Sequence, residues 1–309
     1  MLKILLVEDE PDIAELCSTE IKENILNTEV IIATNALEGY RKARMEAYDL
    51  IWTDYRMPKI LGTDFALALR ETSHNHNVPI VIFSGYVEEA KINCQIKDNI
   101  HYISKLSGVA AAVTILKGIL EQRTKHLLDS KSKGQSNGKD KDDKQQISLE
   151  SPLVKNFICS TVHIMQLMCN LTEIKQTNIK ITTGHEDFSA DVICVVNMST
   201  NDISGYFLLA FTKKVFLKVA EHFLGDKHTE ITKANSLAAV ELSKIIFGHT
   251  RFQLNDQEKI NLQREDPQLI VGKRISITGH RNNMAIISFN TDIGDFIIGI
   301  NPIDNLIKE

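Results

Sequence analysis

The sequence predicts an α/β protein. A doubly wound, five-stranded parallel sheet (flavodoxin-like) is expected in the first part, and an α+β domain with an antiparallel sheet in the second. Two observations indicate this. In residues 1–120, short apolar runs alternate five times with helical patterns, as β–α units in series do. Beyond residue 190, several segments alternate apolar and polar residues, which is typical of antiparallel strands.

The five expected strands are short apolar runs bounded by charged or turn-forming residues, each too short for a helix. They lie at residues 3–7, 30–33, 50–52, 79–83 and 101–104. Helical patterns follow them from residue 11, from residue 35, at 62–71, near 88–97 and from residue 108. In such a sheet the functional crevice lies outside the carboxyl ends of the strands, so the residues that follow each strand are candidates for a site.

Charged or hydroxyl side chains follow four of the five strands. Glu8 and Asp9 follow the first, Asp54 the third, Ser84 the fourth and Lys105 the fifth. Any one of them alone is consistent with a solvated loop residue. All of them together, at one edge of one sheet, indicate a functional site.

This set of side chains suits phosphoryl transfer to a carboxylate. Three crowded acidic groups make a hard oxygen site for Mg²⁺, which binds one or two carboxylates together with phosphate oxygen. An ammonium group and a hydroxyl group can take the other phosphoryl oxygens. The set therefore predicts Asp54 as the nucleophile that forms an acyl phosphate.

With these residues, the first part of the chain resembles the receiver domain of two-component response regulators. Pro58 and Gly62 fit the loop of that family after the phosphoacceptor strand, while Glu8 stands where Asp is commoner and Leu106 where Pro is usual. The resemblance implies that Asp54 is the phosphoacceptor and that Mg²⁺ is held by Glu8, Asp9, Asp54 and the backbone carbonyl of Arg56. It also implies that Ser84 supplies the switch hydroxyl, that Lys105 is the family lysine and that Tyr102 is the aromatic switch. It also implies a cognate histidine kinase as partner and a receiver that catalyses its own phosphorylation from a phosphohistidine donor.

Tyr102 and a pair of histidines in this part each allow a second interpretation. Tyr102 either fills the space that Ser84 leaves when it moves toward the phosphoryl group, or is a half-buried core aromatic. His74 and His76 are interpreted as residues of a solvated loop rather than as a metal pair or a phosphorelay histidine, because no other ligand type is placed near them.

Residues 128–149 are expected to form a flexible polar linker between a receiver domain at 1–127 and an output domain at 150–309. The stretch 131–146 is almost free of apolar residues and rich in Lys, Asp, Ser and Gly, so it cannot bury enough surface to order itself.

The second part begins with an apolar helical pattern from residue 152. Two strand patterns, 191–198 and 206–211, are joined by a turn-rich stretch that predicts a hairpin. Helices are expected at 213–224 and from about 232 to 248, each ending at a glycine, and strands are expected at 273–279, 282–289 and 294–300.

Four segments of the second part carry a further likeness: the helix AVELSKIIFGH at 239–249, the strand GYFLLAF at 205–211, the helix end LGD at 224–226 and the strand GDFIIGI at 294–300. With them, residues 152–309 resemble the CheC/CheX/FliY chemotaxis phosphatase family, and CheX most closely. In that family a helix carries Glu-x-x-Asn, and a Pro follows further along. Glu241 takes the Glu position and Pro267 lies at the expected distance, but Lys244 occupies the Asn position and Leu237 stands where the wider pattern prefers Asp or Ser. By the family mechanism, the Glu grips the lysine of a receiver and the Asn amide positions the attacking water.

Lys244 leaves three alternatives open, because an ammonium group has three donors and no acceptor and cannot accept a hydrogen from that water. Glu241 and Lys244 form an ordinary ion pair on a weakly active binding domain; or Glu241 serves a phosphatase with an altered water-positioning group; or Lys244 binds and protects the acyl phosphate. The expected partner is its own or a separate CheY-like receiver. The non-enzymatic alternative is a binding or homodimerisation module that receiver phosphorylation switches.

Charge and hydropathy limit the classes of partner and the cellular compartment that we expect for this protein. Net charge is −5, and residues 148–309 carry 16 Lys and Arg against 18 Asp and Glu, a net of −2, so nucleic acid is not expected as a partner. No apolar run approaches the ~20 residues of a membrane span, and the first residues lack a signal-peptide layout. The five scattered cysteines are expected to be mostly buried apolar residues. These features predict a cytoplasmic protein without membrane insertion.

Overall fold

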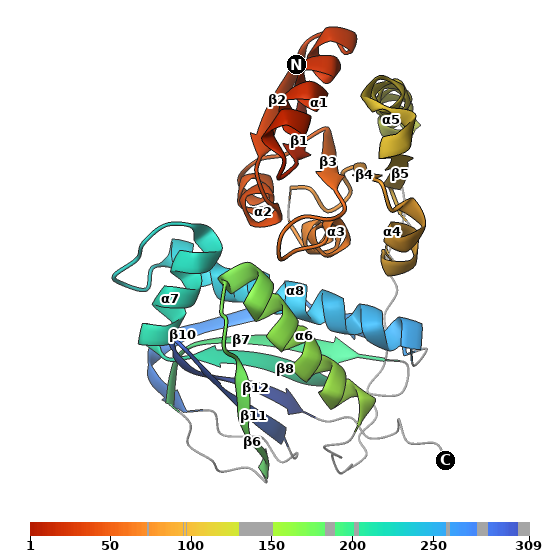
Figure 1. Ribbon diagram of the computed structural model, residues 1–309. Coiled ribbons are helices and arrows are strands. Elements are labelled where there is room, and N and C mark those ends of the chain that lie inside the picture. The colour runs from red at the N-terminus through yellow and green to blue at the C-terminus, as the bar shows by residue number, and fades with distance from the viewer. Residues whose placement is uncertain are drawn as a thin grey trace. The chain divides into compact units, whose positions relative to one another are not determined.

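A computed structural model of the chain describes residues 1–72, 74–94, 96, 98–129, 151–182, 189–200, 204–257, 260–276 and 284–301. The chain divides into two compact units, Met1–Lys141 and Asp142–Glu309, and each is described here by itself (Figure 1). Of the linker predicted at 128–149, residues 130–149 lie outside the described residues.

The first unit is the predicted doubly wound α/β fold. Its five-stranded sheet has the order β2-β1-β3-β4-β5, and all neighbouring strands are parallel. In chain order the elements are β1 (Leu2–Val7), α1 (Pro11–Asn24), β2 (Thr28–Ala33), α2 (Ala36–Met45), β3 (Leu50–Asp54), α3 (Gly62–Arg70), β4 (Ile80–Ser84), α4 (Val87–Asn93), β5 (Ile100–Ser104), the 3-10 helix η1 (Lys105–Ser107) and α5 (Val109–Asp129). The fourth helix is shorter than the expected 88–97.

Helices cover both faces of this sheet (Figure 1). On one face, α1 and α5 pack on buried strand residues, among them Leu6, Trp52 and Phe83. On the other face lie α2 and α3. The strand order reverses at β1, which lies between β2 and β3, so the carboxyl ends of β1 and β3 border the crevice where ligands bind in open α/β sheets.

The loop from β3 to α3 folds back on the end of β3. The amide of Gly62 donates a hydrogen bond of 2.8 Å to the Tyr55 carbonyl, and an isolated bridge joins Arg56 to Leu61. A Cβ atom at position 62 would lie 2.2 Å from the Asp54 carbonyl oxygen. Only glycine lets the loop approach the backbone of Asp54 this closely.

The second unit is an α+β domain, as predicted. Its elements are α6 (Pro152–Cys169), β6 (Lys175–Thr182), β7 (Ser189–Ser199), β8 (Ser204–Phe211), α7 (Lys213–Leu224), α8 (Lys233–Gln257), β9 (Gln263–Arg264), β10 (Gln268–Ser276), β11 (Met284–Thr291) and β12 (Gly294–Asn301). The antiparallel sheet has the order β10-β7-β8-β12-β11-β6, and β9 pairs with β7.

The three helices of this unit lie on one face of its sheet (Figure 1). Phe157 of α6 stacks on Phe207 of β8, with ring centroids 4.7 Å apart, and also contacts Phe247 of α8. The neighbouring residue Leu208 belongs to a second apolar cluster, with Ile193 and Ile286 among its members. Neighbouring residues of β8 therefore face opposite sides of the sheet, and both sides are apolar because the strand is a continuous apolar run.

Three details of the second unit differ from the sequence predictions. Helix α8 continues past Gly248 to Gln257, because Gly248 is buried inside the helix and does not end it. Strand β6 was not predicted, since its sequence KQTNIKIT is largely polar. Strand β10 begins at Gln268, earlier than expected, and residues 277–279 and 282–283 of the predicted strands lie outside the described residues.

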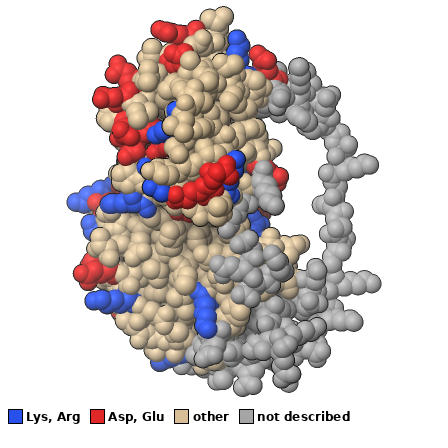
Figure 2. Space-filling model, turned by 45° about the vertical axis from the view of Figure 1, so that its right-hand side comes forward, with Lys and Arg blue, Asp and Glu red and all other residues tan. Residues whose placement is uncertain are grey.

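Four of the five cysteines are buried, and Cys159 is exposed. His74 and His76 are exposed in the turn before β4, as predicted. Figure 2 shows acidic and basic side chains distributed among a larger neutral surface on the face in view. Within the described part of the chain, no helix combines the length and apolarity needed to cross a bilayer.

We expect Gly62→Ala to lower the free energy of unfolding by about 1–3 kcal/mol, because the new methyl group must displace the backbone of Asp54. Urea unfolding followed by circular dichroism measures this change. Gly118→Ala in α5 is the matched control, because a Cβ there meets no atom within 4 Å. The control should stabilise the protein by roughly 0.5–1 kcal/mol. Equal effects at the two positions would contradict the packing argument.

Candidate functional site

Three carboxylates meet at the carboxyl edge of the first sheet. Glu8 and Asp9 follow β1, and Asp54 ends β3. One oxygen of each lies within 4.8 Å of an oxygen of the other two. Glu8 is 1% exposed and Asp54 6% exposed, whereas Asp9 is half-buried. Strand geometry therefore brings together the acidic residues that the sequence predicted.

Lys105 brings a positive charge into this cluster from the end of β5. Its ammonium nitrogen lies 3.0 Å from Asp54 Oδ1 and 3.2 Å from Glu8 Oε2, so one cation bridges two carboxylates. Burial lowers the pKa of Lys105, but the hydrogen bond and charge of Asp54, followed by those of Glu8, outweigh it and the pKa is raised. Lys105 is therefore protonated at neutral pH.

Glu8 is the carboxyl group of the cluster whose ionisation is opposed most strongly. Burial, and next the charge of Asp54, raise the pKa of its carboxyl group to about 7 in spite of Lys105. Its Oε1 atom is buried and has no hydrogen-bond partner among the described residues. A buried oxygen without a partner, beside two further carboxylates, fits a hard divalent cation such as Mg²⁺. The residues present thus fit the metal that the sequence predicted.

Ser84 lies on β4, the strand next to that of Asp54, and Tyr102 lies on β5, one strand further. Ser84 ends β4 and is buried, and its hydroxyl oxygen accepts a hydrogen bond of 2.9 Å from the Tyr86 amide. Tyr102 of β5 is half-buried, and its hydroxyl group donates a hydrogen bond to the sulfur of Cys94 at the end of α4. Burial, and next this hydrogen bond, raise the pKa of Tyr102. Tyr102 therefore connects β5 to α4 rather than to the carboxylate cluster.

A network that was not predicted joins the loop after Asp54 to α4. The guanidinium group of Arg56 lies 3.7 Å from the ring centre of Tyr86 and 2.6 Å from a carboxylate oxygen of Glu89. Glu89 also accepts a hydrogen bond of 3.1 Å from the Tyr55 hydroxyl, which in turn accepts one of 2.6 Å from Asn93. The hydrogen bonds and the ion pair join Tyr55 and Arg56 to residues at least 33 positions further along the chain, so no local sequence pattern indicates them.

The candidate residues of the second unit lie on α8. Glu241 and Lys244 are one turn apart and both are half-buried. Among the described residues, no ion pair joins Lys244 to a carboxylate, so the intrahelical pair with Glu241 is not formed. Leu237, one turn earlier, is 46% exposed, and Pro267 directly precedes β10.

The first unit thus carries a carboxylate–lysine site at the carboxyl edge of a parallel sheet. Residues 4–117 match the response regulator receiver domain family, and residues 192–290 match the family of the chemotaxis phosphatase CheX. The chain thus combines a response regulator receiver domain with a CheX domain.

Curated relatives match part of the chain. Response regulator ArlR of Staphylococcus saprophyticus is 30% identical over 136 residues, which are 42% of this chain and 58% of that protein. A protein-glutamate methylesterase/protein-glutamine glutaminase of Bacillus subtilis is 29% identical over 111 residues, 35% of this chain and 30% of that protein. The chain therefore spans less than two thirds of the length of either relative.

Solved structures with similar folds fall into two groups. CheX of Vibrio vulnificus has 18% identity, a TM-score of 0.45 and covers 49% of this chain and 99% of its own. A CheX-CheY-BeF3-Mg²⁺ complex from Borrelia burgdorferi has 15% identity and a TM-score of 0.41, and the match covers 48% of this chain and 96% of that one. The receiver domain of Francisella response regulator 1452 has 21% identity and a TM-score of 0.34, and the match covers 40% of this chain and 99% of that one.

We expect Glu89→Ala to speed amide hydrogen exchange in α4, because it removes the ion pair of Arg56 and the acceptor of the Tyr55 hydroxyl. The change in global stability should stay below about 1 kcal/mol, since the ion pair is partly exposed. Exchange followed by mass spectrometry measures the effect. Glu88→Ala is the control, because Glu88 pairs only with Lys91 of the same helix among the described residues. If both variants exchange alike, the network does not hold α4.

Proposed function

We propose that this protein is a cytoplasmic response regulator of a two-component phosphorelay, phosphorylated on Asp54. Its parts would be a receiver at 1–127, a linker at 128–149 and an output domain at 150–309. The observation that carries the proposal is the contact of one ammonium group, Lys105, with both Asp54 and Glu8 at the edge of the sheet. A carboxylate that lies beside a fixed cation and between two other carboxylates is suited to receive a phosphoryl group.

In the proposed reaction, an Asp54 carboxylate oxygen attacks the phosphorus of a phosphohistidine on the cognate kinase. The new O–P bond forms as the P–N bond breaks, and the departing imidazole takes up a proton. Lys105 neutralises one phosphoryl oxygen, and the Ser84 hydroxyl donates to another. Glu8, Asp9, Asp54 and the Arg56 carbonyl would hold Mg²⁺, which when bound spreads the charge of the transferred group.

The proposed switch starts at Ser84. When its hydroxyl turns toward the phosphoryl group, it can no longer accept the hydrogen bond from the Tyr86 amide. The loop that carries Tyr86 also contacts Arg56, so its movement would reach α4 through Glu89. Tyr102, hydrogen-bonded to Cys94 at the end of α4, would respond to the same movement.

The CheX domain is proposed to bind a phosphorylated receiver, its own or a separate CheY-like one, through the α8 face that carries Glu241 and Lys244. Since Lys244 cannot accept a hydrogen from an attacking water, hydrolysis there would be slow or absent. An ammonium group outside any ion pair with a described carboxylate favours binding of the acyl phosphate. The alternative remains a phosphatase that positions its water by another group, and a homodimer is a further candidate partner.

Full-length protein supplied with Mg²⁺ and acetyl phosphate is expected to gain one phosphoryl group, measured by intact mass. Asp54→Asn should gain none, and Lys105→Ala should gain it at least about tenfold more slowly because a cation at the transferring group is lost. Asp12→Asn, a first-turn residue of α1, is the control and should label like the original protein. Equal labelling of Asp54→Asn would refute the proposed phosphoacceptor.

For the second domain, we expect Lys244→Asn to shorten the lifetime of the Asp54 phosphate, because an amide can orient water where an ammonium group cannot. The effect of one such positioned group is about tenfold or more. A time course of phosphate loss in full-length protein measures it. Adding Glu241→Ala to Lys244→Asn should restore the original lifetime, and Lys233→Asn on the same helix should change nothing. An unchanged lifetime in Lys244→Asn would show that Lys244 is not what limits hydrolysis.

A further inference from the structure

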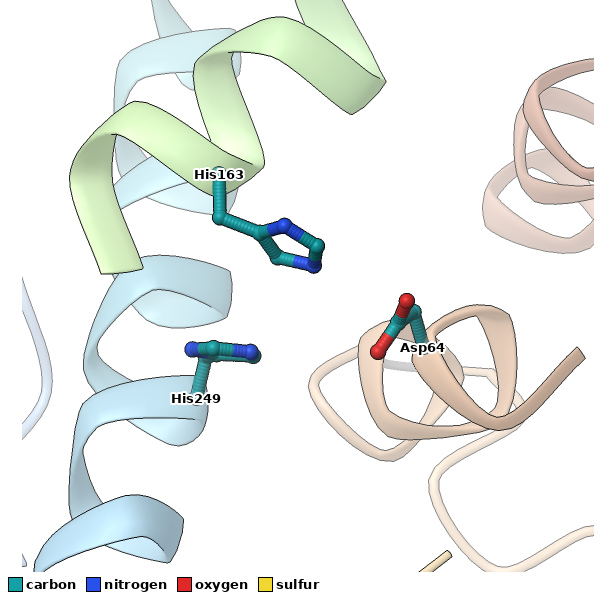
Figure 3. A group of neighbouring side chains, drawn as sticks. All are labelled: Asp64, His163 and His249. Atoms are coloured by element: carbon teal, nitrogen blue, oxygen red, sulfur yellow. The ribbon is translucent and has the colours of Figure 1, made fainter. Parts of the chain in front are cut away.

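Two histidines of the second unit, one on α6 and one on α8, lie ring to ring although they are 86 positions apart in the sequence. The centroids of His163 and His249 are 4.9 Å apart, and the ring planes are inclined by 32°. Figure 3 shows the rings extending from their two helices toward the same side. A nitrogen of each ring lies within 4.8 Å of a nitrogen of the other. The two side chains thus face a common point.

These distances agree with two imidazoles on one metal ion. A Zn–N bond of about 2.0–2.1 Å places the metal roughly 3.2 Å from each ring centre, because the nitrogen lies at the ring edge. Two rings that share a metal at angles between square-planar and tetrahedral then have centroids roughly 4.5–5.2 Å apart. The observed separation falls inside this interval, so little movement is needed for the two rings to chelate one ion.

A buried hydroxyl group orients the ring of His249. Ser160, one turn before His163 and 0% exposed, lies 2.9 Å from His249 Nδ1. The same hydroxyl group lies 3.5 Å from Gln253 Oε1 and can donate to it. When the ring in turn donates from Nδ1 to this hydroxyl oxygen, the lone pair is on Nε2, which is the arrangement of a metal-binding histidine with an outer hydrogen-bond partner.

We propose that His163 and His249 form a two-histidine site for a divalent transition-metal ion of the class Zn²⁺, Ni²⁺ or Cu²⁺. Imidazole nitrogens prefer these ions, whereas the oxygen cluster at Glu8, Asp9 and Asp54 prefers Mg²⁺. The remaining coordination positions are open to water or to an anionic ligand. Bound metal would clamp α6 to α8, the helix that carries Glu241 and Lys244.

The test is a titration of full-length protein with ZnCl₂ or NiCl₂ by calorimetry, in saturating Mg²⁺ so that the oxygen cluster is occupied. All proteins carry Cys159→Ser, because Cys159 is an exposed thiol one helical turn before His163. We expect one site per chain. His163→Asn or His249→Asn should weaken it by more than about tenfold, and Ser160→Ala by about tenfold through loss of the ring orientation.

The double variant His74→Asn, His76→Asn is the matched control, since it removes two exposed histidines from a loop and should leave the titration unchanged. A second readout does not depend on any variant: CuCl₂ added to the Cys159→Ser protein should give an electron paramagnetic resonance spectrum with two equatorial nitrogens. A spectrum with one nitrogen, or affinity that follows His74 and His76, would overturn the proposal. Unchanged affinity in His163→Asn would do so as well.

Discussion

The crowding of three carboxylates around one ammonium group is the constraint on which the first unit depends. Glu8 is buried and in part uncharged near neutral pH, because burial and the charge of Asp54 both oppose its ionisation. Lys105 offsets this repulsion only if β1, β3 and β5 end at the same height. The strand order, the glycine in the β3–α3 loop and the short η1 helix after β5 all serve that alignment.

Much of the first unit was predictable because its site lies at strand ends. Short apolar runs mark the strands, and the residue after each run is read directly from the chain. Contacts between side chains of different elements cannot be read from the chain in this way. The sequence does not indicate that Arg56 contacts Tyr86 or that His163 lies beside His249, because each contact depends on how two elements pack.

The second unit was harder to predict at its edges than in its core. The hairpin of β7 and β8 follows from two apolar runs joined by a turn-rich stretch. Strand β6 lies at the edge of the sheet and is largely polar, so hydrophobic periodicity does not reveal it. In α8, Gly248 suggested an end, but packing of the helix on α6 and on the sheet outweighs the poor helical propensity of one glycine.

The close approach of Gly62 to the Asp54 carbonyl also bears on how this protein can change over evolutionary time. Any amino-acid replacement of this glycine introduces a Cβ atom, and here that atom would lie 2.2 Å from a backbone oxygen. We therefore expect sequence change in the β3–α3 loop to be coupled to change in the backbone at Asp54, so that the two segments vary together.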